Sequence, residues 1–103
     1  MIYSLIEVSA NDEYRKSTIE RLRALRHRVL AAEGCRGFEI LADAEFDQAG
    51  VVPVRPDVIT ILLRWESLHH YAAFRTSPLV LEFVNQNAQY HHGASIRVLK
   101  PEE

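Results

Sequence analysis

Four stretches of the chain carry the apolar pattern of β-strands. Residues 2–9 and 57–66 place apolar side chains on both faces of an extended backbone, which favours strands inside a sheet. Residues 35–46 alternate apolar with polar side chains, as does the segment 91–100, and this pattern is typical of strands with one exposed side. The strongly apolar segment 57–66 is therefore expected to be a central strand.

A helix is expected between the first two strands. Asn11 can cap a helix, and two acidic residues follow it, where the helix dipole favours negative charge. Apolar residues then recur at helical spacing as far as Ala32. We expect this helix to run to about Glu33, where Gly34 ends it.

Two shorter helices are expected between the third and fourth strands. Ser67 predicts the cap of the first, which should end near Arg75, and the pair Ser77-Pro78 predicts the cap and first position of the second. Residues 47–56 contain a glycine and two prolines and predict a loop that is longer than most connections. Long loops carry function more often than short ones.

The order of these elements predicts one α+β domain over residues 1–103, with the ferredoxin-like βαββαβ arrangement. Its sheet should be antiparallel, with the helices on one face. Because the strands 2–9 and 57–66 are apolar on both sides, the other face would be a hydrophobic patch in a monomer. A second copy of the same sheet is the simplest cover, so a homodimer is expected.

Composition narrows the class of partner. The 103 residues include 48% hydrophobic and 25% charged residues, with a formal net charge of −2, which gives no general attraction for nucleic acid or anionic lipid. No apolar run approaches the ~20 residues of a membrane helix, and the first residues do not match a secretory signal peptide. Cys35 is the single cysteine, so we expect no internal disulfide, a buried thiol and a cytoplasmic setting.

Three local sequences resemble one family. They are Glu-Gly-Cys-Arg-Gly-Phe-Glu at 33–39, Arg-Trp-Glu-Ser at 64–67 and Thr-Ser-Pro at 76–78. Together with the order of elements, they resemble the antibiotic biosynthesis monooxygenase family of the dimeric α/β-barrel superfamily. The resemblance implies a homodimer whose two sheets close into a barrel, with a pocket in each subunit between the sheet and the helices.

The resemblance also implies an activity. Members of the family include monooxygenases that oxidise quinols and anthrones without a cofactor, so a small aromatic molecule is the expected substrate. By this resemblance Trp65 would stack on the substrate and Tyr71 would hold its oxygen, and His70, one turn before Phe74, is the candidate base. Substrate-binding side chains are expected at Phe74, Phe83 and Leu63.

Other interpretations of these residues stay open. Trp65 would equally pack in a core, and Tyr71 would equally reach solvent from its helix. Many members of the family have a histidine where this chain has Phe74, which leaves two alternatives: a non-catalytic dimeric ligand-binding or stress-related protein, and a haem-binding or haem-degrading protein. The first strand has neither histidine nor asparagine, which weakens the haem alternative.

No metal site is expected. The pairs at 69–70 and 91–92 are the only adjacent histidines, and adjacent side chains point in different directions, so at most one from each pair would converge on an ion. The basic residues of the first helix are interspersed with acidic ones and are expected to form a solvated face.

Overall fold

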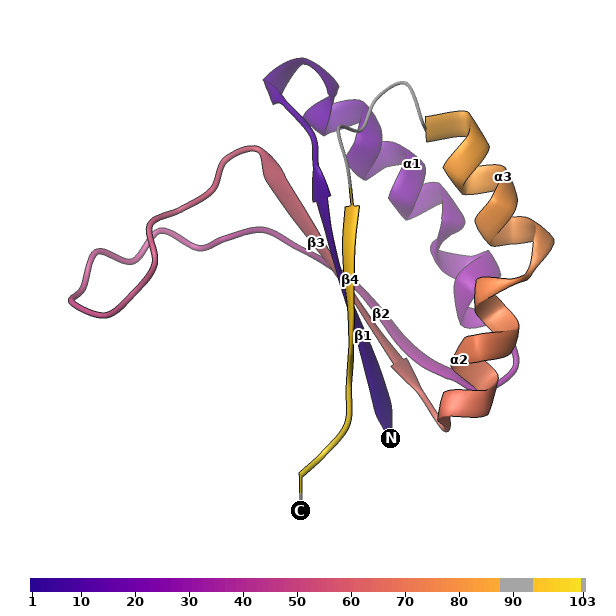
Figure 1. Ribbon diagram of the computed structural model, residues 1–103. Coiled ribbons are helices and arrows are strands. Elements are labelled where there is room, and N and C mark those ends of the chain that lie inside the picture. Colours follow the sequence, from indigo (N-terminus) through magenta and orange to yellow (C-terminus); the bar gives the residue numbers. More distant parts are fainter. Residues whose placement is uncertain (88–93, 103) are drawn as a thin grey trace.

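The computed structural model describes residues 1–87 and 94–102, and the side chains of 83–87 lie outside that description (Figure 1). It confirms the α+β, ferredoxin-like fold: a single antiparallel sheet with the strand order β2-β3-β1-β4. The strands are β1 (Ile2–Ser9), β2 (Cys35–Leu41), β3 (Val58–Trp65) and β4 (Ala94–Leu99). The helices are α1 (Asp12–Leu30), α2 (Leu68–Arg75) and α3 (Pro78–Asn87). The predicted start of the last strand, with His91 and His92, lies outside the described residues.

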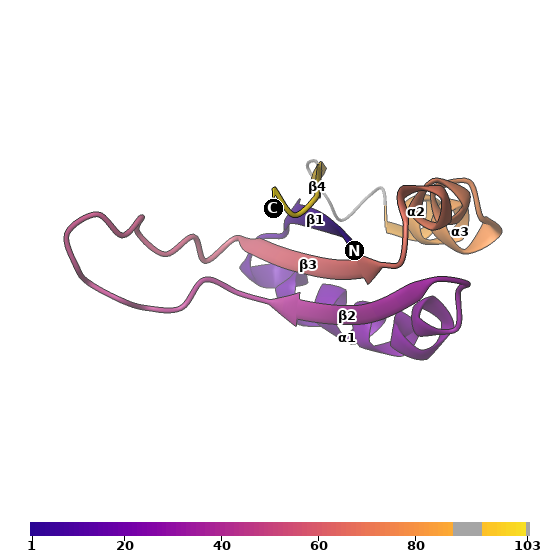
Figure 2. The same ribbon diagram turned by 90° about the horizontal axis from the view of Figure 1, so that it is seen from below.

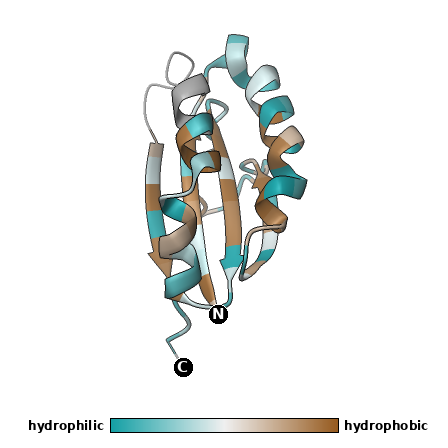
Figure 3. Ribbon diagram, turned by 90° about the vertical axis from the view of Figure 1, so that its right-hand side faces the viewer, coloured by the Kyte–Doolittle hydropathy of each residue, from teal (hydrophilic) through white to brown (hydrophobic). Residues whose placement is uncertain are grey.

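All three helices cover one face of the sheet (Figures 1 and 2). Every second residue of β3 points toward them and is buried, and the view from the helical side shows these hydrophobic strands between α1 and the pair α2 and α3 (Figure 3). The expectation of a central third strand is confirmed, because β3 pairs with both β2 and β1. Burying each large apolar side chain stabilises the fold by about 1.5–3 kcal/mol.

Helix α1 is shorter than predicted. It ends at Leu30 instead of near Glu33. The amides of Ala31 and Ala32 donate hydrogen bonds to the carbonyls of His27 and Val29, four and three residues earlier. The chain turns toward the sheet immediately after the helix. There the carbonyl of Gly34 accepts a hydrogen bond from the Glu66 amide at 2.8 Å.

Strand β2 is also shorter than predicted. It ends at Leu41 instead of Phe46, because its pairing with β3 stops at the partners Leu41 and Thr60. The alternation of side chains continues beyond that point, but the backbone has no neighbouring strand to pair with.

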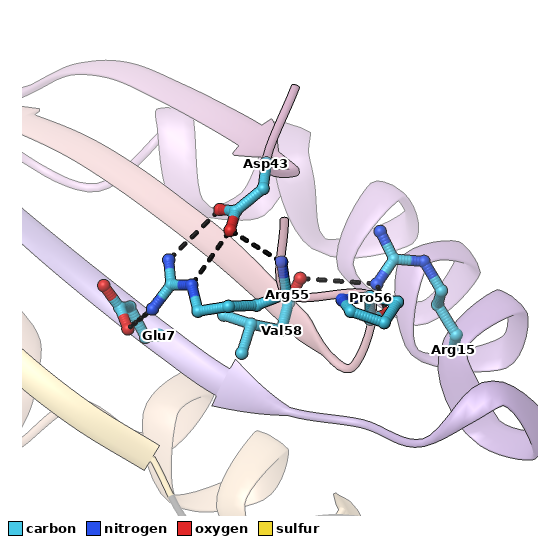
Figure 4. Close-up of polar contacts among 6 residues, drawn as sticks. All are labelled: Glu7, Arg15, Asp43, Arg55, Pro56 and Val58. Atoms are coloured by element: carbon cyan, nitrogen blue, oxygen red, sulfur yellow. Dashed lines mark hydrogen bonds and ion pairs between the residues drawn. The ribbon is translucent and has the colours of Figure 1, made fainter. Parts of the chain in front are cut away.

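The connection 42–57, called the arm below, leaves the sheet on the side opposite the helices (Figures 1 and 2). Its base is fastened by Arg55, whose guanidinium donates to both carboxylate oxygens of Asp43, at 2.9 and 3.1 Å, and to Glu7 of β1 at 2.8 Å (Figure 4). Arg15 of α1 donates to the carbonyl oxygens of Pro56 and Val58 beside it. The tip exposes apolar side chains, with Phe46 60% and Val52 75% exposed.

The face of the sheet away from the helices, called the open face below, carries both apolar and charged side chains. Among the described residues no helix covers it (Figure 1). Leu5 and Leu62 lie at its centre and are half-buried, while Leu41 and Leu99 on the two edge strands are each 41% exposed. The sequence predicted a hydrophobic patch on this face, whereas the charged Glu7, Glu39 and Arg97 lie among its apolar side chains.

Cys35 is buried at the start of β2, as expected, with its Sγ donating to the carbonyl of Gly37 at 3.6 Å. Burial raises the pKa of this thiol, and the nearby Arg36 and Arg64 offset only part of that effect. Cys35 therefore behaves as a packed, protonated side chain.

Candidate functional site

A cleft of about 390 Å³ opens where the end of α1 meets α2 and the start of α3. Its volume lies within the range of about 300–1,000 Å³ that is typical of small-molecule sites. Two of the predicted site residues, His70 and Phe74, lie on this cleft. The lining residues are Arg28, Ala31, Ala32, Glu33, His69, His70, Ala73, Phe74, Ser77, Pro78 and Leu79.

His70 is held at the start of α2 by the cap of that helix. Ser67 is the predicted N-cap, and its Oγ accepts a hydrogen bond from the His70 backbone amide at 3.3 Å. The same oxygen lies 2.7 Å from Nδ1 of the imidazole, so the cap also fixes the ring. On the other side of the ring, Nε2 lies 4.0 Å from a carboxylate oxygen of Glu66, and the side chain is 24% exposed.

The imidazole of His70 packs directly against the backbone of Gly34. A Cβ at position 34 would lie 2.2 Å from His70 Cγ, a distance that no side chain tolerates, and Gly34 also has a φ of +82°. Glycine is required there twice, by the left-handed backbone and by the ring above it. The turn after α1 is therefore part of the site.

Behind the cleft, three aromatic rings fill the space between α2 and the sheet. Phe74 lines the cleft and packs on Trp65 with 4.8 Å between ring centroids, and Trp65 lies 6.0 Å from the Tyr71 ring. Trp65 is fully buried and donates from Nε1 to Ser4 Oγ at 3.4 Å. Tyr71 is 5% exposed and accepts a hydrogen bond from Arg75 at 3.2 Å, which places it in the core instead of in solvent.

The remaining predicted residues lie apart from the cleft or outside the description. Leu63 is buried in the core on β3 and does not line the cleft. Phe83 belongs to α3, but its side chain lies outside the described residues. A pocket between sheet and helices was expected, whereas this cleft is lined by helices and their connections, because the rings of Trp65, Tyr71 and Phe74 occupy the space beneath it.

Two polar residues of the cleft had a different predicted role. Arg28 was expected on a solvated face, and its side chain is 45% exposed; beyond that expectation, it lines the cleft and pairs with Glu82 of α3 at 3.2 Å. Ser77 was predicted to cap α3 through its side chain, yet its buried Oγ has no hydrogen-bond partner among the described residues. The signal for Ser77 was its position before a proline, which does not distinguish a capping hydroxyl from a buried one that makes no cap.

The cleft therefore combines the aromatic ring of Phe74, an oriented imidazole and a cationic side chain. This donor set suits an aromatic molecule with an oxygen substituent. Within the described part of the chain, no three His, Cys, Asp or Glu side chains gather as a metal site would require. No helix in that part has the length and apolar character needed to span a bilayer.

Solved structures share this fold over the full chain. A candidate antibiotic biosynthesis monooxygenase from Deinococcus radiodurans has a TM-score of 0.83 and 16% identity, covering 100% of this chain and 94% of its own. Another from Nitrosomonas europaea has a TM-score of 0.80 and 13% identity, covering both chains completely. The protein Rv0793 from Mycobacterium tuberculosis has a TM-score of 0.79 and 17% identity, with 99% and 95% covered.

At these identities the structural likeness shows the fold alone. No curated protein sequence matches the chain significantly. The model of one sequence family, described as antibiotic biosynthesis monooxygenase, matches residues 1–86 and so includes β1 through α2 and most of α3. Since this match covers most of the 103 residues, the chain belongs to the antibiotic biosynthesis monooxygenase family.

Proposed function

We propose that this protein is a cofactor-independent monooxygenase that oxidises a quinol- or anthrone-type aromatic in the cleft between α1, α2 and α3. The observation that carries the proposal is the placement of His70, Phe74 and Arg28 around one cavity of suitable size. Membership of the monooxygenase family supports the reaction class. The substrate class follows from the Phe74 ring and the polar groups beside it.

The chemistry needs a base and no redox centre in the protein. An anthrone loses a proton from its CH₂ carbon, and the resulting carbanion, conjugated with the ring oxygen, transfers electrons to dioxygen and forms a carbon–oxygen bond. After a proton returns, the substrate hydroperoxide loses water and leaves a ketone. One CH₂ and one O₂ thus give one C=O and one H₂O, and all four electrons that reduce dioxygen come from the substrate.

His70 is the proposed base. Imidazole exchanges protons near neutral pH, and an Nδ1–H that donates to Ser67 Oγ leaves the lone pair of Nε2 available for the substrate proton. Glu66, 4.0 Å from Nε2, would then stabilise the imidazolium.

The other cleft residues bind and orient. Phe74 would stack on the substrate ring, and Arg28 would stabilise negative charge on the substrate oxygen. Trp65 and Tyr71 do not line the cleft, so we assign them the role of fixing the Phe74 ring from behind. Loss of either ring should act through the position of Phe74.

The test is dioxygen consumption with anthrone and with a naphthohydroquinone, corrected for autoxidation without protein. His70→Gln keeps a polar side chain but removes the base, and it should lower kcat by about 10²–10⁴-fold. His27→Gln is the matched control, because His27 is exposed on α1 and does not line the cleft, and its rate should equal that of the wild type.

Three results would reject the proposal. An unchanged rate in His70→Gln would remove the base, and binding of the aromatic without dioxygen consumption would instead indicate a non-catalytic ligand-binding protein. A Soret band on titration with haem, together with activity only after haem is added, would indicate a haem protein.

We also propose that two copies pair through the open face. The exposed Leu41 and Leu99, with half-buried Leu5 and Leu62 between them, form the surface that such pairing would cover.

A further inference from the structure

A second hollow lies between α1 and the sheet, apart from the candidate cleft. Its volume is about 160 Å³, and it shares no lining residue with the cleft. Arg15, Ile19, Arg23 and Arg26 of α1 line one side, and residues of β2, of β3 and of the start of the arm line the other. We call this hollow the arginine pocket.

The arginine pocket collects three positive charges and no negative one. Arg15, Arg23 and Arg26 all line it, whereas none of its lining residues is acidic. Within the described part of the chain, none of these three arginines makes an ion pair. Guanidinium groups gathered around one hollow repel one another, so an anion bound among them would be stabilised by all three.

Two of the three side chains are held in place by uncharged groups. Arg15 donates from Nη1 to the carbonyl oxygens of Pro56 and Val58, at 2.7 and 3.3 Å (Figure 4). Arg26 lies over the ring of Phe38, with its Cζ 5.7 Å from the ring centroid. Because neither contact involves a carboxylate, both guanidinium groups are positioned without losing their net charge.

The rest of the pocket is mostly apolar. Ile59 is 1% exposed, and Ile19 and Ile40 are partly buried and pack against the core. Water in contact with these side chains would be released by an apolar group that covers them. The pocket therefore suits a ligand that carries both a negative charge and an apolar body.

A further hollow along α1 limits where the charge of such a ligand can lie. The two hollows share Arg15, Ile19 and Arg23, so they adjoin. Asp12 and Glu20 line the further hollow and disfavour an anion there. A ligand too long for the arginine pocket would therefore place its charged head in that pocket and its uncharged end along α1.

We propose that the arginine pocket binds an organic anion, with a carboxylate or phosphate head on the arginines and an apolar body on the isoleucines. A guanidinium group matches both heads, because it can donate two parallel hydrogen bonds to their oxygens. A mostly apolar lining with a few charged groups is typical of small-molecule sites. The inference does not depend on the proposed oxidation, which uses a separate set of residues.

Titration of the full chain with hexanoate and with hexyl phosphate tests the proposal. Two-dimensional NMR should show saturable shifts at the amides of Ile19, Ile40 and Leu41, which line the pocket. Arg23→Gln and Arg26→Gln should each raise the dissociation constant at least about fivefold, because each removes a charged hydrogen-bond donor. The head group that binds more tightly distinguishes a carboxylate ligand from a phosphate ligand.

Lys100→Gln is the matched control variant. It removes the same charge at an exposed position after β4, at the edge of the sheet opposite β2, and should leave the dissociation constant within about twofold of the wild type. Acetate and inorganic phosphate carry the charge without the apolar body, and 1-hexanol carries the body without the charge. Each should bind at least about tenfold more weakly than its hexyl counterpart.

The inference is overturned if neither hexyl anion gives saturable shifts at millimolar concentration, or if the shifts lie at cleft residues such as Ala73 and Leu79 instead. It is equally overturned if the arginine variants, shown by circular dichroism to be folded, bind as tightly as Lys100→Gln. Acetate or inorganic phosphate binding as tightly as the hexyl anions would reject an organic ligand. None of these results bears on dioxygen consumption, which is measured separately.

Discussion

Gly34 links the turn after α1 to the His70 ring on α2. Its left-handed backbone turns the chain from α1 into β2, and its missing side chain makes room for the His70 ring. The sequence predicts the turn, since glycine after a helix is a local signal. The contact with His70 could not be predicted, because it depends on how two distant segments pack.

Replacing Gly34 separates these two requirements. Gly34→Ala should destabilise the protein by more than Gly50→Ala, because both positions have positive φ, +82° and +88°, but only position 34 has a side chain in the way. Backbone strain alone costs about 1–3 kcal/mol, and the His70 clash adds to it. Denaturant unfolding measures both values, and equal losses would contradict the contact.

Helix α2 shows how a short element orients a side chain. Eight residues make a marginal helix in isolation, so the Ser67 cap matters both for the helix and for the imidazole it fixes. The cap was predicted from the sequence, as was the placement of His70 and Phe74 on one side of the helix, since residues four apart share a face. Arg28 and Ser77 were assigned other roles, because their approach depends on how α1 packs against α3.

Removing this cap should affect stability and activity together. Ser67→Ala leaves the His70 amide and Nδ1 without their partner, which should lower the free energy of unfolding by about 1 kcal/mol and lower kcat. Asn11→Ala removes the cap of α1, where the side chain accepts from the Tyr14 amide at 3.2 Å, and should lower stability alone. Equal kcat in the two variants would show that Ser67 does not orient the ring.

The arm depends on a pH-sensitive contact. Hydrogen bonds from Arg55 hold the pKa of Asp43 below its usual value of 3.8. A lowered folded-state pKa means that the contribution is fully present above 3.8 and is lost as the pH falls through the lower folded-state value.

Asp43→Asn should accordingly be less stable than the wild type at neutral pH, and the difference should shrink below pH 3.8. Thermal unfolding across this range measures it. A difference that stays constant as the pH falls would mean that the Asp43 charge does not hold the arm.

For the whole molecule, the sequence was most informative where the signals are local or periodic. Strand β3 was predicted to within one residue at each end, because its alternation coincides with its pairing on both sides. Strand β2 was predicted too long, since the segment beyond Leu41 keeps the alternation but lacks a neighbour. The location of the cleft could not be predicted, because it depends on which space the Trp65 ring fills.

The molecule is flat because its helices form a single layer on one face of the sheet. Its extents of 38, 38 and 20 Å describe a flat molecule, with helices on one side and the open face and arm on the other. The two proposed functions therefore use opposite sides: the cleft lies among the helices, and pairing uses the sheet. Variants of one side should leave the other unaffected.

The buried Cys35 thiol can report how often the surrounding core opens to solvent. Its Sγ lies at the start of β2, where Cys35 pairs with the fully buried Trp65, and burial keeps the thiol protonated. A thiol-alkylating reagent can therefore react only when the packing around this end of β2 opens. Because the chain has one cysteine, the labelling rate of the unmodified protein reports how often the core beside the site opens.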